Sequence, residues 1–138
     1  MIPAWAGEYV GLPYADKGRS RDGADCWGGV RMVYREVFGI DLPDYADAYT
    51  SADERDSVAQ AVEAGLTDGW ESVTVPHGGD LLILRVAGRP WHCAIMVNDA
   101  QFLHWPPPNE RGEQQLSCID RIDAPRWAKR LGGWWRHA

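Results

Sequence analysis

Three short apolar runs between residues 81 and 105 constrain the fold of this chain more than any other feature. They cover residues 81–86, 91–97 and 101–105, and two brief turn sequences separate them, at 87–90 and 98–100. Connections this short join antiparallel strands, because parallel strands need a crossover of roughly a dozen residues or more. The second half of the chain is therefore predicted to form an antiparallel sheet.

The first half of the chain shows helical periodicity instead. Cys26, Val30, Val33 and Val37 recur at steps of three and four, which is typical of one buried helix face. Gly39 follows as a left-handed cap that ends this helix. We expect the helix to begin at or next to Cys26, after a polar, turn-forming loop.

The remaining elements are expected around this frame. Helices are predicted at 3–10 and, opening with a capping-box sequence at 51–54, through residue 64. A strand is predicted at 70–75, a short C-terminal helix is expected to be capped by Asp123, and 131–136 is expected to be an edge strand. Helices followed by an antiparallel sheet predict an α+β fold, in one domain spanning residues 1–138.

Composition excludes several classes of function. The formal net charge is −6, which argues against a non-specific nucleic-acid binder. No apolar run is long enough to span a membrane, and no basic cluster suggests a membrane anchor. The N-terminus lacks the pattern of a secretory signal. Three widely spaced cysteines fit neither a disulfide framework nor a zinc knuckle, so we expect synthesis in a reducing compartment and no cofactor or metal.

Cys26 is the candidate nucleophile. At a helix N-terminus, free backbone amides and the helix dipole favour an anion. The pKa of such a thiol can fall from ~8.5 to between about 3.5 and 7.5, so that the thiolate exists at neutral pH. The alternative is a buried core thiol, which is what most free cysteines are. Helix position alone leaves both interpretations open.

His92 and His104 are the candidate partners, because each lies inside an apolar strand pattern. A three-residue loop at 98–100 would place Met96 opposite Phe102 and would put both histidines on one face of the hairpin. A two-residue loop would place them on opposite faces. With the first register, His92 can serve as the base for Cys26, and His104 can orient the His92 ring. Taken singly, each histidine is more readily interpreted as an ordinary sheet residue, and it is the order of Cys26, His92 and His104 together that favours catalysis.

Several sequence fragments together resemble the NlpC/P60 family of cell-wall cysteine peptidases. They are Gly11-Leu12-Pro13-Tyr14, Asp25-Cys26-Trp27-Gly28, Gly79-Asp80-Leu81, His92-Cys93-Ala94-Ile95-Met96-Val97 and Phe102-Leu103-His104. The fragments at 25–31 and 39–45, and the ending at 131–136, are similar to the short phage-tail members of that family.

This resemblance implies a papain-like fold, with the nucleophile Cys26 at a helix N-terminus packed on an antiparallel sheet. It implies hydrolysis of a peptide bond in the peptidoglycan stem peptide by a triad of Cys26, His92 and His104. Tyr14 and Asp25 are implied to be substrate-binding residues. The implied location is a virion tail, with tail hub or tip proteins as partners and with synthesis in the host cytoplasm.

Gly29 and Cys93 depart from the family pattern, since aliphatic residues are more usual at both positions. Gly29 is expected to loosen the first turn of the helix. Cys93 and Cys118 are expected to be core thiols.

Three functions from different classes remain open at this stage. The first is a phage-tail peptidase that opens the cell wall during genome delivery, with amidase chemistry at the sugar–peptide bond as a variant. The second is a structural tail-assembly component with little or no catalytic activity. The third is a metal site built from Cys26, His92 and His104, since one cysteine and two histidines can hold zinc.

Overall fold

The computed structural model describes residues 1–45, 55–66 and 69–137. A 3₁₀ helix, η1, covers Ala4–Tyr9, where the sequence predicted a short helix. The other helices are α1 (Cys26–Phe38), α2 (Arg55–Ala64) and α3 (Pro125–Ala128). The strands are β1 (Arg19–Ser20), β2 (Gly23–Ala24), β3 (Trp70–Val73), β4 (Leu81–Val86), β5 (Arg89–Met96), β6 (Gln101–His104), β7 (Cys118–Arg121) and β8 (Leu131–His137).

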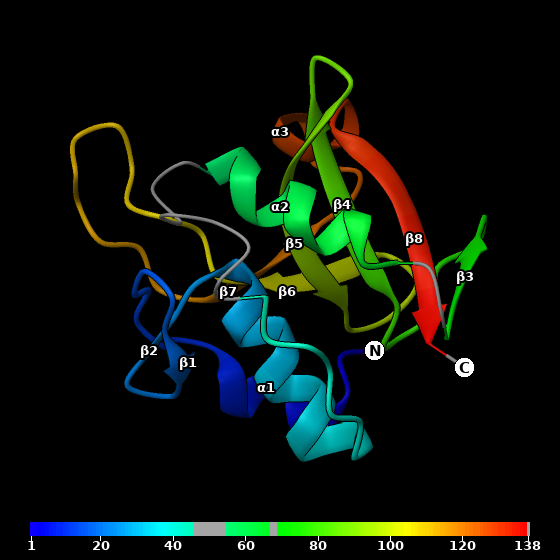
Figure 1. The fold of residues 1–138 in the computed structure, drawn as a ribbon, viewed down its shortest axis with the longest axis horizontal. Coiled ribbons are helices and arrows are strands. Elements are labelled where there is room, and N and C mark those ends of the chain that lie inside the picture. The colour runs from blue at the N-terminus through cyan, green and yellow to red at the C-terminus, as the bar shows by residue number, and fades with distance from the viewer. Residues whose placement is uncertain (46–54, 67–68, 138) are drawn as a thin grey trace.

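Six strands form one sheet in the order β3-β8-β4-β5-β6-β7, and every neighbouring pair is antiparallel (Figure 1). The predicted hairpin register is confirmed, because Met96 pairs with Phe102. β1 and β2 form a separate small hairpin that leads into α1. The predicted α+β class is therefore confirmed, with the consecutive antiparallel strands β4, β5 and β6 side by side in the sheet.

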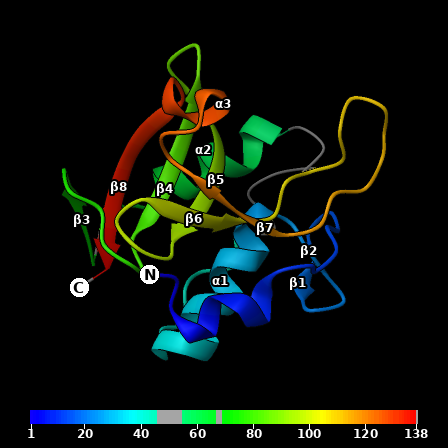
Figure 2. The same ribbon diagram turned by 180° about the vertical axis from the view of Figure 1, so that it is seen from behind.

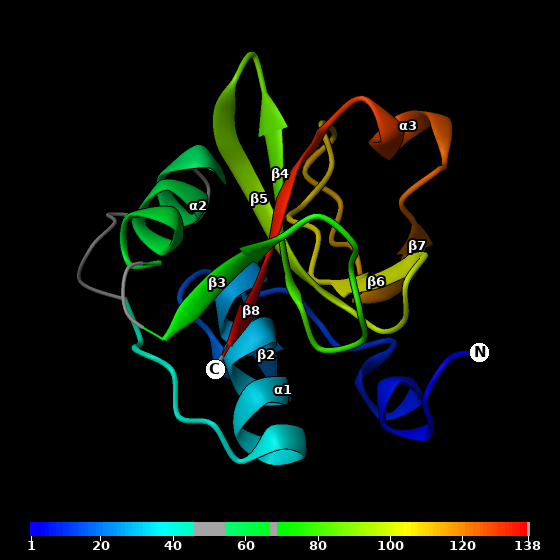
Figure 3. The same cartoon turned by 90° about the vertical axis from the view of Figure 1, so that its right-hand side faces the viewer.

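Helices cover the two faces of the sheet unequally. α1 and α2 lie on one face, and the single turn of α3 closes the other (Figure 3). The helix-side core joins residues of α1 and α2 to alternate residues of the central strands, among them Leu81, Ile83, Cys93 and Ile95. The α3-side core consists of Leu82, Leu84, Ala94, Met96, Phe102 and Trp127. Residues 81–84 of β4 show no polar alternation because both faces of the strand are buried there.

α1 begins and ends where the sequence predicts. Gly39 adopts the left-handed conformation at φ 69°, and its backbone N–H donates to the carbonyl of Tyr34. Among the described residues, none of the helices combines the length and the apolar character that crossing a bilayer requires.

Two predictions for the remaining elements are wrong, and a third concerns residues that the structure does not describe. β8 is not an edge strand, because β3 pairs along its outer side (Figure 2). Asp123 does not cap α3: Ala124 occupies the cap position, and Asp123 instead pairs with Arg121 at 2.9 Å. The predicted capping box at 51–54 lies outside the described residues.

Candidate active site

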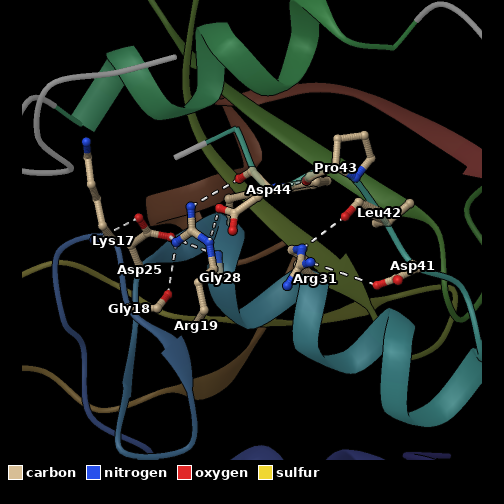
Figure 4. A network of polar contacts seen from close by, with 11 residues as sticks. Lys17, Gly18, Arg19, Asp25, Gly28, Arg31, Asp41, Leu42, Pro43 and Asp44 are labelled. Atoms are coloured by element: carbon tan, nitrogen blue, oxygen red, sulfur yellow. Dashed lines mark hydrogen bonds and ion pairs between the residues drawn. The ribbon is translucent and has the colours of Figure 1, made fainter. Parts of the chain in front are cut away.

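Asp25 fixes the start of α1 and with it the position of Cys26. Its Oδ1 accepts a hydrogen bond from the backbone N–H of Gly28 at 2.7 Å, which is the geometry of a helix N-cap. The same oxygen accepts from Arg19 Nη1 at 3.0 Å, and Oδ2 accepts from the backbone N–H of Lys17 at 3.2 Å (Figure 4). Asp25 is fully buried, so the structure gives it a positioning role. Direct contact between Asp25 and substrate stays a prediction.

Gly29 lets the first turn of α1 approach the sheet closely. A Cβ added at this position would lie 2.1 Å from Cε3 of Trp105, well inside van der Waals contact. The Trp105 ring is fully buried. Trp105 directly follows His104, the last residue of β6. The glycine that departs from the family pattern therefore seats the N-terminus of α1 against the strand that carries the second histidine.

Cys26 begins α1, as predicted, and is 4 % exposed. Its side chain forms a hydrogen bond with Cys93 on β5. Burial first, and then this contact with Cys26, raises the pKa of the Cys93 thiol well above its usual value. Burial and the nearby Asp120 carboxylate raise the pKa of Cys118 to about 11. Neither Cys93 nor Cys118 is thus suited to be a thiolate at neutral pH.

His92 and His104 form a buried pair. Nε2 of His92 lies 2.9 Å from Nδ1 of His104, and the side chains are almost wholly inaccessible. The expectation that the two histidines share a face and contact each other is confirmed. The indole ring of Trp127 lies edge-on to His104 at 5.3 Å between ring centroids and fixes the ring from the α3 side.

Asp120, which was not predicted from the sequence, forms a hydrogen bond with His104 on the ring nitrogen that faces away from His92. Oδ2 of Asp120 lies 2.8 Å from Nε2 of His104, and this hydrogen bond is the main reason that the pKa of Asp120 is lowered. Cys118 lies beside them, with Sγ 3.5 Å from the same His104 nitrogen. Both residues come from β7, a four-residue strand in which only Ile119 is strongly apolar, so no sequence pattern marks it.

These partners determine where the protons lie on the two rings. An ionised carboxylate can only accept, so Nε2 of a neutral His104 carries the proton and Nδ1 is the acceptor. His92 must then donate from Nε2 to His104, which leaves Nδ1 of His92 as its basic nitrogen. The chain Asp120–His104–His92 therefore holds His92 in the tautomer that a general base needs.

The two halves of the predicted triad lie on different faces of β5. Cys93 belongs to the helix-side core with Cys26, whereas His92 pairs across the sheet with Leu84 of the α3-side core. Adjacent strand residues point to opposite faces, so Cys93 and His92 point apart. The β5–β6 pairing joins Ile95 and Met96 to their partners, so His92 lies beyond that ladder. The pairing of Cys26 with His92 stays a prediction, and thiol–imidazole contacts are often loose before substrate binds.

Tyr14 lies on the loop before β1 and packs against the helix-side core that contains Cys26. It forms an isolated β-bridge with Ala24, and its carbonyl accepts from the side chain of Gln114 at 3.2 Å. Tyr14 is therefore held close to the start of α1, and a role for it in substrate binding stays a prediction.

Comparison with known proteins identifies the family of this chain. The model of the NlpC/P60 family matches residues 11–136. The chain belongs to the NlpC/P60 family. It is 35% identical to Protein P54 of Enterococcus faecium over 109 residues, which cover 79% of this chain and 18% of that protein. It is 26% identical over 123 residues to the murein DD-endopeptidase MepS/murein LD-carboxypeptidase of Escherichia coli K12, covering 89% of this chain and 54% of the other.

Solved structures agree with this assignment. The NlpC/p60 domain of the peptidoglycan hydrolase SagA superposes with a TM-score of 0.60 at 27% identity, over 98% of this chain and 93% of that domain. An NlpC/P60 family protein from Bacillus cereus ATCC 10987 gives a TM-score of 0.66 at 21% identity, over 99% and 41% of the two chains, and shows the same fold. The chain spans 18% of the length of Protein P54 and 54% of the length of the Escherichia coli enzyme. The fold predicted from the sequence resemblance is confirmed.

Proposed function

We propose that this NlpC/P60 chain is a cysteine peptidase that hydrolyses a peptide bond within the peptidoglycan stem peptide. The observation that carries the proposal is the oriented pair His92–His104, backed by Asp120, in a chain whose Cys26 opens a capped helix. The names of two relatives, a murein endopeptidase and a peptidoglycan hydrolase, support the same substrate class.

In the proposed reaction, Cys26 attacks the scissile carbonyl as a thiolate, after Nδ1 of His92 has taken its proton. Backbone amides at the start of α1 stabilise the oxyanion that develops, and such donors contribute ~3 kcal/mol each in comparable sites. His92 then protonates the leaving amine and afterwards activates the water that releases the acyl group. In this reaction Cys26 pairs with His92 in place of its hydrogen bond with Cys93.

Digestion of purified peptidoglycan sacculi tests this function. The wild-type protein should release soluble peptide fragments whose masses identify the bond, and Cys26→Ala should release none while it keeps its circular dichroism spectrum. Cys118→Ala is the matched control, because that thiol lies 3.5 Å from Nε2 of His104 and takes no part in the proposed attack. Equal cleavage by wild type and Cys26→Ala would refute the proposal, and fragments cut at the sugar–peptide bond would identify an amidase instead.

The similarity of residues 25–31, 39–45 and 131–136 to short phage-tail proteins supports a more specific role. In this role the enzyme is carried in a virion tail, contacts the tail hub or tip, and opens the cell wall during genome delivery. Mass spectrometry of purified particles tests it directly, because a tail enzyme is found at a fixed ratio to tail proteins. Absence from particles would restrict the proposal to the hydrolase itself.

A further inference from the structure

His104, Cys118 and Asp120 form a group that the proposed hydrolysis uses only in part. Nε2 of His104, Sγ of Cys118 and one carboxylate oxygen of Asp120 all lie within 4.8 Å of one another. Imidazole nitrogen, thiolate sulfur and carboxylate oxygen are the three donor types that zinc prefers in proteins. We propose that these three residues form an inhibitory site for Zn²⁺, distinct from the Cys26–His92–His104 site considered from the sequence.

The separations between the donor atoms already approach those of a tetrahedral zinc site. With ordinary Zn–N, Zn–O and Zn–S bonds, nitrogen and oxygen ligands stand about 3.3 Å apart, and sulfur stands about 3.5 Å from either. In the structure, the separations are 2.8 Å from Nε2 to Oδ2, 3.5 Å from Sγ to Nε2 and 3.8 Å from Sγ to Oδ2. Binding thus needs side-chain shifts of about half an ångström.

The surroundings also meet the other requirements of a metal site. His104 is almost fully buried, while the side chain of Asp120 is 36 % exposed, so an ion has a path from solvent to the third ligand. The side chain of Trp127 donates a hydrogen bond to Asp120 and orients it from behind. Nδ1 of His104 contacts Nε2 of His92, which gives the metal-binding imidazole a partner on its far nitrogen.

Zinc binding would reverse the proton arrangement of the histidine pair. A metal on Nε2 of His104 moves that ring's proton to Nδ1, which then donates to Nε2 of His92. His92 must in turn carry its own proton on Nδ1, so the nitrogen that should accept the Cys26 proton is occupied. Both histidines keep one proton each, and the only proton released comes from the Cys118 thiol, which binds as thiolate.

Binding of Co²⁺ as a spectroscopic substitute for Zn²⁺ tests the site without any substrate. Wild type should bind one Co²⁺ with a thiolate-to-metal charge-transfer band, release one proton, and lose the cobalt to added Zn²⁺. Cys118→Ala should lose the band, and Asp120→Asn should bind at least about tenfold more weakly. Cys93→Ala is the matched control and should retain the band. No band in wild type, or a band that survives Cys118→Ala, would overturn the proposal.

The inhibitory part rests on the proposed function and has its own readout. Zn²⁺ should slow peptide release by wild type and leave Cys118→Ala much less affected, while ¹⁵N spectra of the histidines show the proton moving to Nδ1 of both rings. If the protein binds Co²⁺ as expected but cleaves nothing, the metal site stands and the proposed hydrolase fails. Equal inhibition of wild type and Cys118→Ala would refute regulation through this site.

Discussion

The two faces of β5 differ in how the candidate catalytic residues are arranged. On the α3 side, His92, His104 and Asp120 are joined by hydrogen bonds of 2.9 and 2.8 Å. On the helix side, the Cys26 thiol is hydrogen-bonded to the Cys93 thiol. The acid–base half is thus set before any substrate arrives, whereas the nucleophile occupies a resting contact. From this comparison we expect that formation of the proposed Cys26–His92 pair is the step that makes the proposed peptidase competent.

The largest expected effect comes from removing either half. Cys26→Ala and His92→Ala should each lower the rate of peptide release from sacculi by about 10⁴-fold or more, because both act as one unit. The double variant should be no worse than either single one. Cys118→Ala should stay within about tenfold of wild type, since its thiol has a raised pKa and no part in the attack. Inactivity of Cys118→Ala beside an active Cys26→Ala would move the nucleophile to the histidine face.

A smaller effect is expected from the carboxylate that orients the histidines. Asp120→Ala should lower kcat by about 10- to 100-fold with little change in KM, because His92 then samples the wrong tautomer. ¹⁵N spectra should show mixed tautomers for His104 in this variant, and Asp120→Glu should restore part of the rate. Asp123→Ala removes a nearby exposed carboxylate and serves as the control. An Asp120→Ala variant with normal kcat would reduce Asp120 to a structural residue.

Stability on the helix side should depend on the close contact at Gly29. Gly29→Ala should lower the free energy of unfolding by about 1–3 kcal/mol, because the new methyl group meets the buried Trp105 ring. Gly7→Ala is the matched control, since nothing lies within 4 Å of a Cβ added there. Urea denaturation followed by tryptophan fluorescence gives both values. Equal stability of the two variants would show that α1 can move away from β6 at no cost.

The smallest predicted effect is a pH dependence of stability on the histidine side. The His104 hydrogen bond lowers the pKa of Asp120 below its ordinary value of 3.8, so the ionised carboxylate favours the folded state. This contribution is present above the unfolded-state pKa and is lost as pH falls through the folded pKa. The stability difference between wild type and Asp120→Asn should therefore shrink below about pH 4 in urea titrations. A constant difference from pH 3 to pH 7 would contradict the assigned cause.

The elements with strong local patterns could be predicted from the sequence. The step of three and four from Cys26, the stop at Gly39 and the three apolar runs led to α1, β4, β5 and β6, and to the register between β5 and β6. The turn predicted at 87–90 is shorter in the structure, because Arg89 and Pro90 already pair with β4. β8 was predicted to be an edge strand, because its pairing with β3 joins segments far apart in the sequence and no pattern within β8 predicts that pairing. The prediction that Asp123 caps α3 was wrong, because the Asp123 carboxylate forms an ion pair with Arg121 instead.

The candidate site divides in the same way. His92 and His104 were found because strand alternation in a tight hairpin places them together. Asp120 and Cys118 were missed, since the thirteen residues 105–117 separate β7 from β6 and no periodicity predicts that β7 pairs beside His104. The contact between Cys26 and Cys93 depends on how closely α1 approaches the sheet, which is a property of packing at Gly29 and Trp105 rather than of either cysteine.

The most direct test of the account is the pH dependence of Cys26 alkylation by iodoacetamide in wild type and in His92→Gln, with modified sites identified by peptide mass spectrometry. If His92 pairs with Cys26, wild type should react at Cys26 near pH 6 about tenfold or more faster than His92→Gln, and the two rates should converge at alkaline pH. If the two proteins give the same rate at every pH, Cys26 and His92 do not act together, and the two faces of β5 do not form one active site.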